Sequence, residues 1–135
     1  MEFTVLDSQS TNIVRLGDDR TRVREALGHY RTFSPGRGVY DTDQFLESGT
    51  MVTYADDRVI MLELVEPSSV SLRGVQLLGE TLDALEPQLA QVGVHLEPYE
   101  LAAYGSEVVV AAIPEYEVRL YVPYDFVEGV QLGNT

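Results

Sequence analysis

Two short stretches of the chain share the same spacing of apolar residues. Each has a Leu-Gly pair with apolar residues six and ten positions after the glycine: Leu16-Gly17, Val23 and Leu27 in the first, and Leu78-Gly79, Leu85 and Leu89 in the second. Apolar residues four positions apart lie on one face of a helix. A strongly apolar, strand-like segment follows each stretch, at 51–66 and at 107–124. Self-similarity of this kind predicts two helix-plus-strands units, 1–67 and 68–126, within a single compact domain.

Two interpretations of this similarity stay open. The stretches are offset by 62 residues (79 minus 17), whereas hairpins aligned at Val59 and Val118 are offset by 59. A tandem duplication with a three-residue deletion explains both offsets. Chance resemblance explains them too, because amphipathic helices share their apolar spacing whatever their origin.

The pattern predicts an α+β fold with two helices packed on a mainly antiparallel sheet. The first helix is expected at 19–27, capped by Asp18 and ended by Gly28, and the second at 82–92, ended by Gly93. Pro87 is expected to delay or kink the second helix, because it removes a backbone donor. Strands are expected at 3–5, 13–16, 50–55, 58–66, 94–96, 101–104, 107–113 and 117–124. We expect a loop at 29–38 and a frayed tail at 126–135.

Composition excludes several classes of site. The chain has no cysteine, which removes disulfides, thiolate nucleophiles and cysteine-based zinc sites. It has no apolar run of membrane-spanning length, and its acidic beginning lacks the features of a secretory signal, so we expect a cytoplasmic location. Asp41-Thr42-Asp43 has the spacing of a metal loop, but no further ligands follow, and a solvated loop is expected. We therefore predict no catalytic residues, no metal and no cofactor.

Charge is unevenly distributed along the chain. The net charge is −13, to which residues 1–37 contribute +1 and residues 38–135 contribute −14. Such a field repels nucleic acid and anionic membranes and attracts basic partners. Two explanations stay open: acidic residues that keep the protein dispersed, or an acidic face that fits a basic protein.

Five residues are the candidates for contacts with a partner. Asp56, Asp57, Glu115 and Glu117 are expected at the tips of two hairpins, and Tyr121 is expected on the exposed side of a strand. Exposed tyrosine beside carboxylates is typical of protein-binding surfaces. The alternative is local: aspartate suits turns, and tyrosine suits half-buried strands.

The stretch from Leu16-Gly17 to Leu27-Gly28 resembles the opening of a helix-plus-meander repeat. That repeat occurs in β-lactamase inhibitory proteins, which carry two copies, and in small outer-membrane assembly lipoproteins. The second stretch departs from it, with Leu89-Ala90 in place of Leu-Gly, and the chain lacks the cysteine pair of many secreted members. The resemblance implies a non-catalytic fold that grips another protein with its sheet. The small acidic immunity proteins of bacteria fit these features equally well.

The sequence therefore predicts non-enzymatic protein binding, of the inhibitor or immunity type, through an acidic and tyrosine-bearing sheet face. Two alternatives stay open. One is an enzyme or small-ligand-binding protein whose site is assembled from scattered residues, and the other is a structural homo-oligomer.

Overall fold

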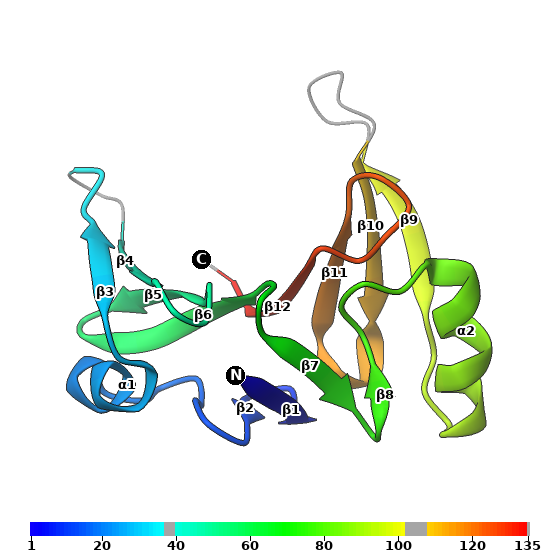
Figure 1. The fold of residues 1–135 in the computed structure, drawn as a ribbon, viewed down its shortest axis with the longest axis horizontal. Helices are drawn as coiled ribbons and strands as arrows, with labels where there is room; N and C mark the ends of the chain where they lie inside the picture. The colour runs from blue at the N-terminus through cyan, green and yellow to red at the C-terminus, as the bar shows by residue number, and fades with distance from the viewer. Residues whose placement is uncertain (37–39, 102–107, 135) are drawn as a thin grey trace.

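The predicted α+β class is confirmed, although the strands form two sheets instead of one. The computed structural model describes residues 1–36, 40–101 and 108–134. Within these residues, a large sheet has the order β3-β4-β5-β6-β12-β11-β10-β9 and a small one the order β2-β1-β7-β8 (Figure 1). The elements are β1 (Glu2–Asp7), β2 (Ser10–Thr11), α1 (Arg20–Leu27), β3 (Tyr30–Phe33), β4 (Asp41–Phe45), β5 (Met51–Ala55), β6 (Arg58–Leu64), β7 (Ser69–Leu72), β8 (Val75–Gln76), α2 (Leu82–Gln91), β9 (Glu97–Leu101), β10 (Val108–Ile113), the 3₁₀ turn η2 (Pro114–Tyr116), β11 (Val118–Val122) and β12 (Gly129–Gly133).

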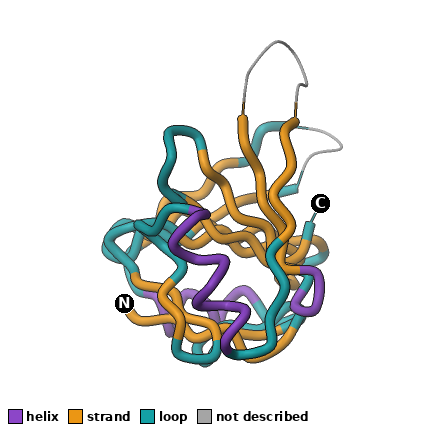
Figure 2. The backbone as a smooth tube through the Cα atoms, turned by 90° about the vertical axis from the view of Figure 1, so that its right-hand side faces the viewer, coloured by secondary structure: helices purple, strands orange, loops and turns teal. Residues whose placement is uncertain are grey.

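The large sheet is bent like a U, with the β3–β4 and β9–β10 hairpins rising at its two ends (Figure 1). Both helices and the small sheet lie on its convex side, and the view turned by 90° shows the long strands rising above them (Figure 2). Neighbouring strands of the large sheet are all antiparallel, whereas β1 and β7 of the small sheet run parallel. We call the concave side of the large sheet, which no helix or other sheet of the described residues covers, the open face.

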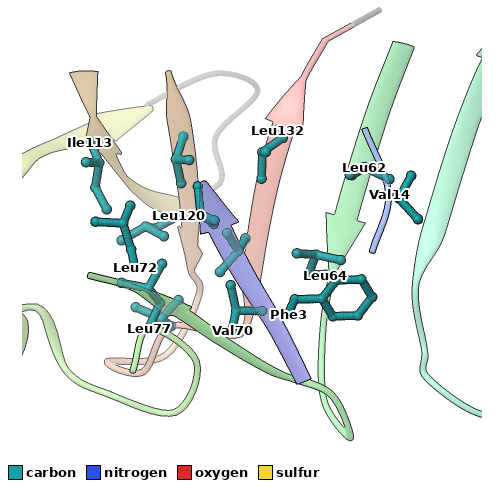
Figure 3. Packing of buried hydrophobic residues seen from close by; sticks show 14 of the residues in the cluster. Phe3, Val14, Leu62, Leu64, Val70, Leu72, Leu77, Ile113, Leu120 and Leu132 are labelled. Atoms are coloured by element: carbon teal, nitrogen blue, oxygen red, sulfur yellow. The ribbon is translucent and has the colours of Figure 1, made fainter. Parts of the chain in front are cut away.

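The hydrophobic core lies between the large sheet and the layer formed by the helices and the small sheet. Apolar side chains of β1 and β7 pack there against those of β6, β11 and β12 (Figure 3). The residues expected to be buried in central strands are confirmed at Leu62, Val118, Leu120 and Val122, each at most 4% exposed. Ile60 is only partly buried, because a β-bulge places it as an extra residue between the pairs Tyr54–Val59 and Thr53–Met61.

Helix α1 forms where the apolar spacing predicts it. Val23 and Leu27 are buried, and Gly28 ends the helix at a φ of 88°. The capping residue is Asp19, whose carboxylate accepts a hydrogen bond from the Thr21 amide, and not the predicted Asp18. Asp18 instead accepts a hydrogen bond from the Arg15 amide, one turn earlier.

Helix α2 contains Pro87 and begins at Leu82, so the expected late start is wrong, while the alternative of a kink stays a prediction. The Thr81 hydroxyl accepts a hydrogen bond from the Ala84 amide and fixes the beginning of the helix. Leu85 and Leu89 are fully buried and hold the helix against the sheet. Pro87 lies on the exposed side, where water can reach the carbonyl that loses its partner.

Several strand assignments are corrected. Residues 30–33 form β3 instead of a loop, while 13–16 and 94–96 are not strands. The supposed frayed tail contains β12, which pairs with β6 on one side and β11 on the other. The strand expected at 101–104 falls mostly outside the described residues.

The same order of elements occurs twice: a short hairpin, a helix and four strands. A pair of backbone hydrogen bonds also recurs: Val59 bonds with Gly17 and Asp18, as Val127 bonds with Gly79 and Glu80. The residues that accept and donate these bonds, Val59 and Val127, are therefore offset by 68 positions (127 minus 59). In this element order β6 corresponds to β12, whereas the hairpin alignment of Val59 with Val118 matches β6 with β11.

Candidate functional site

The four predicted carboxylates are exposed, but two already have partners. Asp56 and Asp57 form the β5–β6 turn with φ of 51° and 61°, and the Asp57 carboxylate lies 3.1 Å from Nε of Arg20. In η2, Glu115 accepts a hydrogen bond from the His95 amide at 3.1 Å. The charges of Asp57 and Glu115 therefore contribute to local structure as well as to the surface.

Both turns lie at the same edge of the large sheet. Strands β6 and β11 are each antiparallel to β12, which lies between them, so their first residues share one edge. The topology thus brings the four carboxylates to a common edge, which we call the acidic edge. Tyr121 lies four residues beyond Glu117, about 13 Å along the strand, and does not join them.

The open face carries a hollow of about 380 Å³ that sequence reasoning did not predict. Its lining is mainly apolar and comes from β5, β6, β10, β11, β12 and the residues beside them: Met51, Glu63, Val65, Val110, Arg119, Tyr121, Glu128, Gly129, Val130 and Gln131. Tyr121 is the one predicted site residue among them, and it is 48% exposed. The prediction that Tyr121 lies on the exposed side of its strand is confirmed.

The strand register explains the shape of the hollow. Gly129 is paired with Tyr121, and a Cβ at Gly129 would lie 3.4 Å from that of Tyr121, so the missing side chain keeps the space beside the ring open. Gln131 is paired with both Glu63 and Arg119. Two strand spacings place the Cα atoms of Glu63 and Arg119 about 10 Å apart. Among the described residues, no ion pair joins them.

Glu63 is the unusual residue of this surface. Its side chain is partly buried, and burial raises its pKa above the ordinary value. Within the described part of the chain, no hydrogen bond or ion pair to its carboxylate is found. The available sequence signal was a single acidic residue inside the otherwise apolar run from Val59 to Leu64.

A second polar cluster lies on the helix side of the sheet. Asp43 is fully buried in β4, which corrects the expectation of a solvated loop. It accepts hydrogen bonds from Arg24 at 2.8 and 3.1 Å, from Thr32 at 2.6 Å and from Tyr54 at 3.0 Å. Burial alone would raise the pKa of Asp43, yet these donors outweigh it and hold the pKa below the ordinary value. Because solvent does not reach Asp43, the cluster is structural.

The remaining observations place few limits on chemistry. In the described ranges, no group of His, Cys, Asp and Glu is arranged to hold a metal ion. No helix of the described chain is long and apolar enough to cross a membrane. Comparison with protein-family models, curated proteins and solved structures finds no match to this chain.

Proposed function

We propose that this chain is a non-enzymatic protein-binding module, of the inhibitor or immunity type, that holds its partner on the open face. The observation that carries the proposal is the hollow of about 380 Å³ on a sheet face that no other element of the described chain covers. Apolar surface rimmed by charged residues is typical of protein-interaction sites. The exposed Tyr121 is a suitable anchor, because a tyrosine offers a large contact area with little entropy to lose.

The partner is expected to be basic. The chain has a net charge of −13, and the acidic edge borders the open face. Exposed charges of this kind raise association rates more than they tighten a complex. Changing Asp56, Asp57, Glu115 and Glu117 to their amides should therefore slow association, and added salt should slow the unmodified protein in the same way.

The test is affinity capture from the source cell with matched tyrosine variants. Tyr121→Ala removes the anchor from the hollow, whereas Tyr124→Ala removes an 81% exposed tyrosine three residues away that does not line it. We expect one protein to be captured by the unmodified chain and by Tyr124→Ala, and to be lost with Tyr121→Ala. Capture that is equal for both variants, or no capture at all, would contradict the proposal.

Binding of a small molecule is the second candidate. The volume of the hollow falls within the range of small-molecule pockets, about 300–1,000 Å³. A ligand that binds only the folded protein raises its melting temperature. A thermal-shift screen against metals, nucleotides and sugars would favour this candidate if one compound stabilises the protein and Tyr121→Ala abolishes the effect.

We also propose that the two halves are copies of one unit. The recurring element order and the matching bonds of Val59 and Val127 support this. Superposition of the two halves should place Val23 on Leu85 and Leu27 on Leu89 while aligning the four strands that follow. Helices that superpose only when the strands are misaligned would favour chance resemblance.

A further inference from the structure

The hollow combines a carboxylate that has no bonding partner among the described residues with an aromatic ring. Glu63 lies in mainly apolar surroundings, where a charge without a partner is costly. Tyr121 offers its half-exposed ring on the same face, two strands away. We propose that the hollow receives an arginine side chain of the partner, with Glu63 binding the guanidinium and Tyr121 stacking against it. This inference rests on the proposed protein-binding function and specifies the chemistry of the partner.

The chain itself contains the same combination of groups with the guanidinium in place. Arg24 lies over the ring of Tyr30 at 4.1 Å and donates two hydrogen bonds to the carboxylate of Asp43. A guanidinium suits such a site because it is planar, weakly hydrated and able to bind a carboxylate through two parallel hydrogen bonds. A lysine ammonium keeps its water more strongly and binds a carboxylate as a point charge.

Charge complementarity also favours a cation. Glu63 and Glu128 contribute two negative charges to the lining and Arg119 contributes one positive charge, so the hollow is negative overall. The apolar walls at Met51 and Val65 strengthen electrostatic attraction by excluding water. Arg119 opposes an incoming arginine, and its removal should therefore favour binding. The two substitutions Glu63→Gln and Arg119→Gln are expected to act with opposite sign.

The experiment uses the full chain and a defined probe. N-acetyl-L-arginine methylamide is titrated into ¹⁵N-labelled protein, and the amide shifts of Gly129 and Gln131 report on the hollow. N-acetyl-L-citrulline methylamide is the neutral control of the same shape, and the lysine analogue tests the choice of cation. Glu25→Gln is the matched protein control, since it removes one exposed carboxylate from α1 on the other side of the sheet.

We expect the arginine probe to bind more tightly than the lysine probe, and the citrulline probe to leave the two amides unmoved. Glu63→Gln should weaken arginine binding at least about tenfold, the scale of a hydrogen-bonded charge. Arg119→Gln should tighten it, and Glu25→Gln should leave it unchanged. Spectra dispersed as in the unmodified protein will show that each variant is folded.

Three results would overturn the inference: equal shifts from arginine and citrulline, no effect of Glu63→Gln, or tighter binding after Glu63→Gln and weaker binding after Arg119→Gln. The last would indicate an anionic occupant. Each of these results can occur while the unmodified chain still captures a partner that Tyr121→Ala loses. In that case the protein-binding function stands, and the inferred binding of an arginine is wrong. Arginine binding without any captured protein would support the arginine site and contradict the proposed protein-binding function.

Discussion

Removing the carboxylate of Asp43 should destabilise the fold more than any surface substitution. Asp43 is fully buried, and Asp43→Ala would leave Arg24, Thr32 and Tyr54 without their acceptor. Breaking a buried ion pair by removing one partner costs about 3–5 kcal/mol. Because the Arg24 side chain is 27% exposed and water can reach part of it, we expect about 3 kcal/mol, or a melting temperature lower by roughly 10 °C.

Urea unfolding followed by far-UV circular dichroism measures this cost, since the chain has no tryptophan to report by fluorescence. Arg22→Ala is the control: its side chain is 58% exposed, it lies 3.5 Å from Asp18, and its loss should cost no more than about 0.5 kcal/mol. The double change Arg24→Met with Asp43→Leu should cost less than the two single changes together. A cost below about 1 kcal/mol for Asp43→Ala would refute the structural role.

The same carboxylate predicts the direction of acid unfolding. The folded pKa of Asp43 lies below its unfolded value near 3.8. Its contribution is therefore fully present above pH 3.8 and is lost as the pH falls through the folded pKa. The Asp43→Asn variant should be less stable at pH 7, and its stability should decline less steeply below pH 3.8 than that of the unmodified protein.

Three further predictions concern other parts of the sheet. Glu63→Gln should raise the free energy of unfolding at pH 7, because burial raises the folded pKa of Glu63 above its unfolded value near 4.5 and the buried charge is costly. For the same reason the contribution of Glu63 should make the unmodified protein more stable as the pH falls from neutral toward 4.5. Urea titrations at pH 7 and pH 5 measure both effects. Gly133→Ala should cost at least about 2 kcal/mol, because a Cβ there would strike the backbone of β6, whereas Gly93→Ala, with a similar φ and open space, should cost about 1 kcal/mol. Leu62→Ala and Leu120→Ala should each cost about 2–5 kcal/mol in urea unfolding, and costs below 1 kcal/mol at both would contradict their central burial.

The parts of the fold that could be predicted are those with local signals. Helix α1 combines four-residue apolar spacing with a capping aspartate and a terminal glycine, all within ten residues. Strand β3 has no such signal: its four residues are exposed at the sheet edge, and pairing with β4 and contacts with Arg24 of α1, distant in sequence, order them. Strand β12 is short and begins and ends with glycine. Its position comes from pairing with β6, more than sixty residues away in the chain, and with β11, 8 to 14 residues away.

The candidate site shows the same division. Alternation along β11 predicts that Tyr121 points away from the core. Nothing local connects it with Glu63, because the two residues are 58 positions apart (121 minus 63) and only the register of β6, β12 and β11 brings them to one hollow. The hairpin tips were easy to find in the sequence for the opposite reason: Asp56 and Asp57 at one tip and Pro114 at the other are local turn signals, whether or not a partner contacts them.

The hollow is lined by strands from both halves of the chain. On these strands, the residues that face the core differ from the residues that line the hollow. In β6, Leu62 and Leu64 are fully buried on the helix side, while Glu63 between them faces the open side. Successive residues of a strand point to opposite faces, so the core can hold the strand in place while the open face carries a charge that costs stability. A carboxylate that carries that cost supports the proposed binding of a cation on the open face. Variants at Glu63 should therefore change affinity for a cationic partner and leave the fold intact.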